Sequence, residues 1–217
     1  MERLLDIFIS LSLIILLFPF LILISFILMI TGEKKILYLQ QRVGRKKINF
    51  NLIKFATMLE NSPNIGTKTI TLKNDPRVLP FGKFLRLTKL NELTQLFNIL
   101  KGDMSFVGPR PLTLENFNLY EDNIKNIIIK VRPGLTGIGS IFFRNEEEIL
   151  NGSNSLKFYK ENISPYKGKL ENWFVNNKNL LVYLKTLILT GIILFYPNKN
   201  LLFIFFKGIP QPPKILL

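Results

Sequence analysis

Residues 7–32 carry no charged side chain and consist almost entirely of Leu, Ile, Phe and Ser. An apolar run of this length is enough to reach across the hydrocarbon core of a bilayer. It does not have the form of a cleaved signal peptide, because the preceding residues are not basic, the run is too long and no small-residue cleavage site follows. We therefore expect residues 1–32 to be a membrane element that stays attached to the rest of the chain.

Pro19 lies in the middle of this run, where it removes a backbone donor and presses against the carbonyl of Ile15. The helix should therefore kink or break at that point. Two arrangements stay open: a spanning helix that tolerates the proline, or a re-entrant helix that returns to the leaflet it entered. Basic residues follow the run at 34, 35, 42 and 45–47, so the positive-inside rule predicts a cytoplasmic C-terminal flank.

Residues 33–185 have a globular composition without internal repeats, and we expect them to form one cytoplasmic domain. A second apolar stretch, Thr186–Tyr196, is too short to span a bilayer. With Leu201–Phe206 and a proline-rich tail it makes up a third segment, 186–217. We expect its helices to lie in the membrane interface, and packing in a core is the open alternative.

The chain contains neither cysteine nor histidine, which excludes disulfides, thiol nucleophiles, Cys- or His-based metal sites and imidazole bases. Its chemistry must rely on carboxylates, lysine, hydroxyl groups or the backbone, and a carboxylate metal site would suit a hard ion such as Mg²⁺. The 29 Lys and Arg residues against 15 Asp and Glu give a formal charge of +14, which needs an anionic partner. No nucleic-acid-reading motif occurs, so we expect anionic membrane lipid and phosphorylated substrates as partners, and no nucleic acid.

The strongest helix signal covers Lys89–Lys101, where apolar residues recur at helical spacing. Thr88 is the expected N-cap, and Gly102 is the expected residue after the C-terminus. Asn91 and Glu92 would then lie in the first turn, where free N–H groups and the helix dipole favour anions.

Arg110 stands between Pro109 and Pro111, which restrict its backbone and present the guanidinium as a fork for phosphate oxygens. A structural salt bridge is the alternative for this arginine. Other basic residues that a phosphate site could use are Lys54, Arg86, Lys101, Arg132 and Arg144. The run Glu146–Glu148 is better explained as a solvated helix start than as a metal site, because adjacent helical residues point in different directions.

The segment Leu85–Pro111 resembles the signature of the bacterial sugar transferase family, the monotopic phosphoglycosyl transferases. Further segments match family motifs in the same order: Gln41–Gly44, Lys54–Met58, Asn74–Arg77, Phe81–Gly82 and Arg132–Gly137. The resemblance thus covers about residues 41–137, with the apolar run in its usual place before them.

The resemblance implies an α/β fold, a small domain seated on the membrane with a proline-broken, re-entrant N-terminal helix and interfacial amphipathic helices. Both ends of that helix would face the cytoplasm at the bacterial inner membrane. The implied reaction moves a phosphosugar from a nucleoside diphosphate sugar, usually a UDP-sugar, to polyprenyl phosphate and so begins polysaccharide or glycoconjugate assembly. In it, an aspartate of an Asp-Glu pair attacks the β-phosphorus, and Mg²⁺ binds the substrate pyrophosphate.

Carried over by position, the resemblance gives Glu92 the role of Mg²⁺ ligand and Arg110 that of phosphate ligand. It places Lys54 and Arg86 at the active site. Asn91 occupies the position of the nucleophilic aspartate, and a carboxamide is a poor nucleophile toward phosphorus.

Because Asn91 stands in place of the nucleophilic aspartate, two functions stay open. In an active transferase Glu92 would be the nucleophile, with Asp103 or direct attack by the lipid phosphate as alternatives. In a catalytically silent relative the chain would bind nucleotide sugar or lipid phosphate as a scaffold. Ala56 stands where the family has arginine and Tyr183 where aspartate is common, which favours natural divergence of the whole set.

Overall fold

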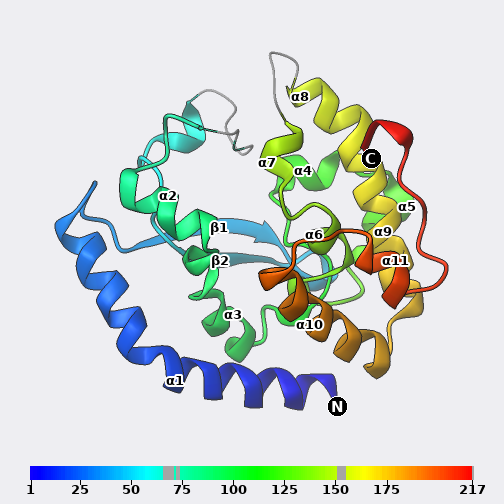
Figure 1. Ribbon diagram of the computed structural model, residues 1–217, viewed down its shortest axis with the longest axis horizontal. Coiled ribbons are helices and arrows are strands. Elements are labelled where there is room, and N and C mark those ends of the chain that lie inside the picture. The colour runs from blue at the N-terminus through cyan, green and yellow to red at the C-terminus, as the bar shows by residue number, and fades with distance from the viewer. Residues whose placement is uncertain (66–70, 72–73, 151–154, 217) are drawn as a thin grey trace.

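The computed structural model describes residues 1–65, 71, 74–150 and 155–216. It combines helices with two small sheets, the mixed α and β character expected from the sequence. Helix α1 (Glu2–Ile30) runs along one side of the molecule, and the other elements form a domain that rests on it (Figure 1). Within the described residues, α1 is the one helix long and apolar enough to cross a bilayer.

Helix α1 is continuous through Pro19, and it bends partway along its length (Figure 1). The proline removes one helical N–H and its ring crowds the preceding turn, which accounts for a bend. Leu21, Ile24 and Leu28 pack on the domain, whereas most other apolar side chains of α1 are exposed. The apolar N-terminal segment is thus a bent helix with an apolar outer side.

Both ends of α1 are attached to the same domain. Near its N-terminus, Arg3 donates hydrogen bonds to the carbonyl oxygens of Ile99 and Leu100, at 2.6 and 2.8 Å. Near its C-terminus, Leu28 belongs to an apolar cluster with Phe55 of the domain. The helix therefore lies against the domain at both ends.

A buried carboxylate strengthens the attachment of the N-terminal end. Asp6 is 1% exposed and accepts hydrogen bonds from Ser105 Oγ at 3.0 Å, Phe106 N at 2.9 Å and Tyr183 Oη at 2.8 Å. Burial and the bond to Asp6 raise the pKa of Tyr183, so its hydroxyl remains a donor. Tyr183, a departure from the family pattern, thus has a structural partner on α1.

The first sheet is an antiparallel hairpin of β1 (Leu37–Val43) and β2 (Asn49–Phe55). Tyr38 pairs with Lys54, and Arg42 pairs with Phe50. Because side chains alternate along a strand, Arg42 and Lys54 share one face of the hairpin.

The predicted helix over Lys89–Lys101 is divided, and this prediction was wrong in its first half. Helix α2 (Pro80–Leu87) ends just before Lys89, whose φ of 61° is in the left-handed region. A 3₁₀ turn, Leu90–Glu92, comes next, and α3 (Gln95–Lys101) follows it. Asn91 and Glu92 therefore lie in a tight turn and not in the first turn of a long helix.

The two predicted end residues of that helix differ in outcome. Thr88 is not an N-cap, because it follows the last turn of α2 and its Oγ1 donates to Phe84 O at 2.8 Å. Gly102 is confirmed as the residue after the C-terminus, with a left-handed φ of 101° and its N–H donated to Asn98 O.

The second sheet pairs β3 (Ser105–Val107) and β4 (Gly134–Thr136) in parallel. The remaining α-helices of the described chain are α4 (Leu114–Asn118), α5 (Asp122–Ile128), α6 (Ile138–Phe142), α7 (Glu146–Ile149), α8 (Ser155–Phe158), α9 (Ser164–Asn177), α10 (Leu180–Phe195) and α11 (Leu201–Phe205). The main core gathers buried side chains from α3, β3, α6, α9 and α10.

Helix α10 begins ahead of the expected apolar stretch, so that Lys185 lies inside it. Tyr183 and Leu189 are buried in the main core, while Ile188 and Phe195 are exposed. Core packing therefore applies to one face of this helix, and the other face is free to meet an apolar environment.

Candidate functional site

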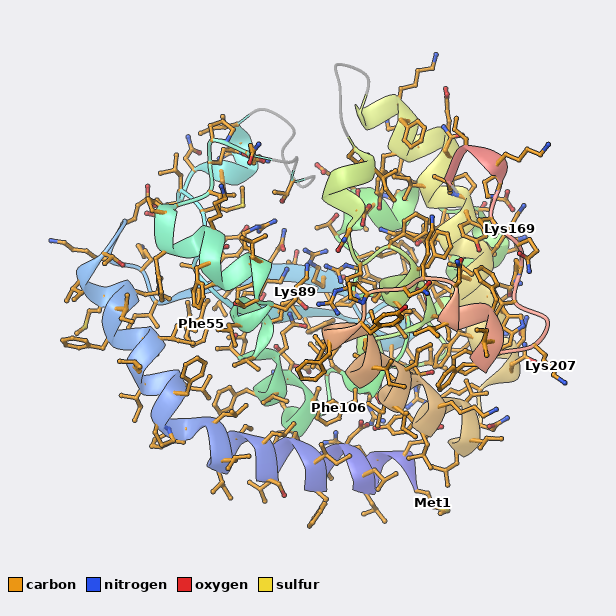
Figure 2. All side chains as sticks on the ribbon, viewed as in Figure 1. Met1, Phe55, Lys89, Phe106, Lys169 and Lys207 are labelled. Carbon is orange, nitrogen blue, oxygen red and sulfur yellow. The ribbon has the colours of Figure 1, made fainter. Side chains whose placement is uncertain are left out.

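A cavity of about 740 Å³, here called the cationic cavity, lies between the hairpin, the turn after α2 and the segment 139–146. Six of the site residues predicted from the sequence line it: Lys54, Arg86, Asn91, Glu92, Arg110 and Arg144. Figure 2 shows nitrogen-bearing side chains gathered near Lys89, which also lines this cavity. Tertiary folding thus brings together basic groups that are far apart in the sequence.

Glu92 is the carboxylate in the 3₁₀ turn that faces these cations. Its side chain is 20% exposed, and its Oε1 lies 3.7 Å from Arg110 Nη2. Burial opposes ionisation, but the pKa of Glu92 is lowered by four basic residues, Arg110, Lys54, Lys89 and Arg86. Glu92 is therefore an ionised carboxylate at neutral pH.

The lowered pKa of Lys54 indicates an excess of positive charge in the cavity. Its pKa is lowered to about 7, first by burial and then by neighbouring arginines, with Glu92 acting in the opposite direction. The arginines responsible are Arg42, Arg110 and Arg86. A bound polyanion would add the negative charge that the site lacks and would raise the pKa of Lys54 again.

Arg42 belongs to the same cavity. It stands in the family-like segment Gln41–Gly44, but it was not among the predicted site residues. Its Nη1 donates to Pro111 O at 3.0 Å, its Nη2 bonds to Gln40 Oε1, and its buried Nε has no partner within the described residues. Burial and the charge of Arg110 lower the pKa of Arg42 to about 10. The period-two pattern of the hairpin, which puts Arg42 and Lys54 on one face, is the signal that could have found it.

The loop that carries Arg110 is held from both sides. Gly134 N donates to Pro109 O at 2.8 Å, and Val43 N donates to Leu112 O at 2.9 Å. The salt bridge considered for Arg110 is present, since its guanidinium contacts Glu92. That contact lies inside a cavity with further cations, so the same side chain also faces the space available to an anion.

Behind this loop lies Glu171 of α9, a residue that no sequence pattern singled out. Glu171 is 3% exposed, its Oε1 accepts a hydrogen bond from Arg110 N at 3.4 Å, and its Oε2 is buried without a partner in the described chain. Burial raises the pKa of Glu171 to about 7. No local motif marks this residue, because its position follows only from the packing of α9 against α6.

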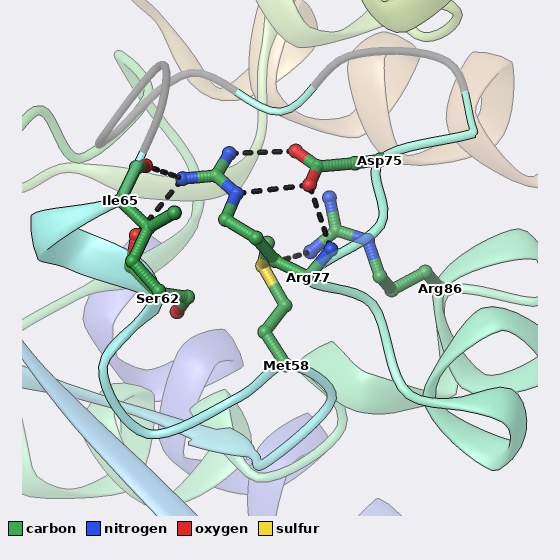
Figure 3. A network of polar contacts seen from close by, with 6 residues as sticks. All are labelled: Met58, Ser62, Ile65, Asp75, Arg77 and Arg86. Atoms are coloured by element: carbon green, nitrogen blue, oxygen red, sulfur yellow. Dashed lines mark hydrogen bonds and ion pairs between the residues drawn. The ribbon is translucent and has the colours of Figure 1, made fainter.

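Arg86 stands beside a buried polar network (Figure 3). Arg77 donates to both oxygens of Asp75, from Nε at 2.9 Å and from Nη2 at 2.6 Å. Nη1 of Arg77 donates to two carbonyl oxygens, those of Ser62 and Ile65. Arg86 Nη1 lies 3.7 Å from Met58 Sδ. The Asp75–Arg77 pair is therefore structural and fastens the segment beside the cavity wall.

Arg144 lines the cavity near the start of α7, and its Nη1 donates to Ile193 O at 3.1 Å. Glu146 is the first residue of α7, as expected. Its side chain, which was expected to face solvent, instead forms an ion pair. Its Oε2 lies 2.6 Å from Lys167 Nζ, and both residues line the cavity.

Asp103 and Arg132 do not line the cavity. Asp103 Oδ2 lies 3.4 Å from Lys101 Nζ and accepts from Asn98 Nδ2 at 3.3 Å. Arg132 Nε donates to Gly102 O at 2.8 Å. Both residues are placed at the far end of α3 because the chain turns away from the cavity at Gly102.

No cluster of three or more acidic side chains that could hold a metal occurs among the described residues. Two residues of the 3₁₀ turn that line the cavity nevertheless carry oxygen donors: the Glu92 carboxylate, and Asn91 Oδ1, which is buried and has no partner in the described part of the chain. This donor set fits Mg²⁺, which is often bound through one or two protein oxygens together with substrate phosphates.

The family model described as bacterial sugar transferase matches residues 1–196. A Haemophilus influenzae protein named as an uncharacterized sugar transferase is 38% identical over 159 residues, which cover 67% of this chain and 33% of that protein. An undecaprenyl-phosphate galactose phosphotransferase of Salmonella typhimurium is 36% identical over 160 residues, 67% of this chain and 33% of its own length.

A third relative is a Klebsiella pneumoniae protein named UDP-glucose:undecaprenyl-phosphate glucose-1-phosphate transferase. It is 38% identical over 144 residues, which cover 64% of this chain and 30% of the relative. The chain thus spans about a third of the length of these relatives.

Proposed function

Because the chain belongs to the bacterial sugar transferase family, we propose that it transfers a phosphosugar from a nucleoside diphosphate sugar to polyprenyl phosphate. The observation that carries the proposal is the cationic cavity, where the basic side chains of Arg110, Lys54, Lys89 and Arg86 face the ionised carboxylate of Glu92. The Klebsiella pneumoniae relative, which is named for transfer between UDP-glucose and undecaprenyl phosphate, supports a UDP-sugar donor and a polyprenyl phosphate acceptor. Such a reaction begins the assembly of a polysaccharide or glycoconjugate.

The basic residues of the cavity are suited to holding a pyrophosphate. Arg110 presents a planar guanidinium that can bond two phosphate oxygens at once, and Lys54 and Arg86 add charge from the other walls. Fixed cations of this kind stabilise the charge that develops on phosphate oxygens as a phosphoryl group is transferred. We assign donor binding to these residues, with Arg42 and Arg144 at the edges.

We assign the nucleophile's role to Glu92. Its carboxylate oxygen would attack the phosphorus that bears the sugar, and the bond from this phosphorus to the nucleoside monophosphate would break. An oxygen of the lipid phosphate would then attack the same phosphorus and release Glu92, leaving a sugar pyrophosphoryl lipid. Asn91 lacks the required charge, and the placement of Asp103 outside the cavity favours Glu92 over it.

Mg²⁺ would be held by the Glu92 carboxylate and Asn91 Oδ1, with the remaining ligands supplied by the substrate pyrophosphate. A bound Mg²⁺ would neutralise charge on the phosphate oxygens.

The test of this proposal is release of nucleoside monophosphate by the purified protein in nanodiscs, with a panel of UDP-sugars, Mg²⁺ and undecaprenyl phosphate. We expect the native chain to release UMP and Glu92→Gln to lose at least about a hundredfold in kcat, because the amide is not a nucleophile. Asp103→Asn is the matched control, since that carboxylate lies outside the cavity, and it should keep native turnover.

Asn91→Asp separates an active transferase from a silent scaffold. If the native chain is inactive across the panel and only Asn91→Asp releases UMP, the native protein binds its ligands without transfer. Full turnover by Glu92→Gln would contradict the role assigned to Glu92 and would favour direct attack by the lipid phosphate.

We also propose that α1 is a re-entrant helix in the bacterial inner membrane, with the domain on the cytoplasmic side. The attachment of both helix ends to one domain supports this arrangement, because a straight spanning helix would carry its two ends to opposite sides of the bilayer. The bend of α1, seen in Figure 1, and its exposed apolar outer side support it further.

A further inference from the structure

A second cavity, of about 260 Å³ and here called the apolar cavity, adjoins the cationic cavity at the C-terminal end of α1. Its walls come from α1, from the segment after β2 and from the start of α2, and they are mostly apolar: Leu28, Ala56, Met58, Leu79, Pro80 and Phe81. Ala56 and Met58 line both cavities, as do the two charged residues Glu33 and Lys35. The two spaces are therefore neighbours with a shared wall.

The shared wall lies next to Arg86, one of the cations assigned above to phosphate binding. Arg86 lines the cationic cavity, and its Nη1 is 3.7 Å from Met58 Sδ (Figure 3). An anion held by Arg86 would therefore lie close to the junction, with charge on one side and apolar walls on the other. Ala56, whose side chain is a single methyl group, is the smallest residue at this junction.

The surface outside the apolar cavity is also apolar. The last turns of α1 expose Phe26, Met29 and Ile30, and Phe84 and Leu87 are exposed on α2. An apolar chain coming from a bilayer along α1 would meet the cavity at the end of the same helix. Burial of such a chain in an apolar space is favourable because it removes hydrocarbon from water.

We propose that the apolar cavity binds the isoprene units nearest the phosphate of the polyprenyl phosphate acceptor, with that phosphate facing Arg86. This inference rests on the proposed function, since it assigns a binding site to the acceptor of that reaction. The combination of one narrow apolar cavity and one adjoining cation matches a ligand with a single branched hydrocarbon chain on a phosphate.

The first test places a bulky side chain in the cavity wall. Thr31 lines the apolar cavity and is exposed, whereas its exposed neighbour Ile30 does not line it. We expect Thr31→Trp to raise the KM for undecaprenyl phosphate by about tenfold and to leave the KM for the UDP-sugar unchanged. Ile30→Trp, the matched control, should change neither constant. A folded Thr31→Trp variant with an unchanged lipid KM would overturn the proposal.

The second test needs neither turnover nor a variant. A polyprenyl phosphate with a diazirine on its first isoprene unit is photolysed with the native protein in nanodiscs, and the labelled peptides are mapped. We expect labels at 28–32 or 79–82, reduced by excess undecaprenyl phosphate and not by phosphatidylglycerol. Labels elsewhere, or displacement by phosphatidylglycerol, would reject the polyprenyl chain as the occupant.

The two tests separate this inference from the proposed function. Labelling at the apolar cavity without UMP release would leave the acceptor site standing and contradict transfer. UMP release with labelling elsewhere would leave the transfer standing and contradict the acceptor site.

Discussion

At the scale of single residues, burial favours the uncharged form of two titratable groups, a lysine and a glutamate. The pKa of Lys54 is lowered to about 7 and that of Glu171 is raised to about 7, in both cases chiefly because an uncharged group is easier to bury than an ion. Lys54 faces the space where an anion would bind, whereas Glu171 supports the backbone of Arg110 from behind. Desolvation by burial thus acts both on a residue that lines the cavity and on a residue that supports the Arg110 loop.

Glu171 should make the stability of the protein depend on pH. Between the ordinary carboxyl pKa of 4.5 and about 7 the folded chain binds more protons at this site than the unfolded chain. The free energy of unfolding should therefore fall as pH rises through this range, by up to about 3 kcal/mol. Chemical denaturation in detergent at pH 5 and pH 7 measures the difference, because above pH 7 the lowered pKa of Lys54 adds a dependence of the opposite sign.

Glu171→Gln should remove most of that pH dependence, because the amide can still accept from Arg110 N but does not ionise. Glu161→Gln is the control, since Glu161 is exposed and pairs only with Lys157 in the described chain. The assignment fails if Glu171→Gln has the same pH dependence of unfolding as the native protein.

At the scale of elements, the position of the 3₁₀ turn depends on how closely α2 approaches the segment after β2. A Cβ atom at Gly82 would overlap the carbonyl oxygen and Cα of Thr57, which are backbone atoms that cannot rotate away. Gly82 therefore allows α2 to lie against the strand end, and α2 in turn places the turn that carries Asn91 and Glu92.

Gly82→Ala should destabilise the protein by about 2 kcal/mol, because the backbone of α2 or of Thr57 must shift. The matched control is Gly191→Ala in α10, where a Cβ would meet nothing within 4 Å. That change should be neutral or stabilising by roughly 0.5 kcal/mol, because alanine favours a helix. Equal thermal midpoints for the two variants would contradict the close approach at Gly82.

At the scale of the whole molecule, α1 acts as a base to which the domain is fastened at two separated points. Arg3 and Asp6 hold its N-terminal end through hydrogen bonds, and Leu28 holds its C-terminal end through apolar packing. The bend between these points lets both contacts form on one side of the helix (Figure 1). The apolar outer side then faces away from the domain over most of its length.

The absence of cysteine makes the orientation of α1 directly measurable. One variant carries a single cysteine through Lys34→Cys, and a second variant carries a single cysteine in a short tag before Met1. For a re-entrant helix we expect a membrane-impermeant maleimide to label both from the cytoplasmic side, in inverted vesicles and not in spheroplasts. Labelling of the two positions from opposite sides would show a spanning helix.

Local patterns were sufficient wherever one short segment determines its own structure. The uncharged run at 7–32 indicated the apolar helix, Pro19 its bend, and Gly102 the end of α3, since each depends on neighbouring residues alone. The motif at 85–111 likewise indicated the family, because its residues are contiguous in the chain. Thr88 was misjudged because the left-handed conformation of Lys89, which is rare outside glycine, has no local signal.

Only the tertiary structure decided which charges meet. Arg132 and Asp103 stand in or near family motifs yet lie away from the cavity, whereas Arg42 and Glu171 contribute through strand pairing and helix packing over long separations in sequence. Burial, which sets the pKa values of Lys54 and Glu171, is likewise a property of the folded chain. The sequence by itself determined the apolar N-terminal helix, the family and the shortage of nucleophiles. The fold determined how the Glu92 carboxylate came to face several cations, because charge interactions depend on distance in space.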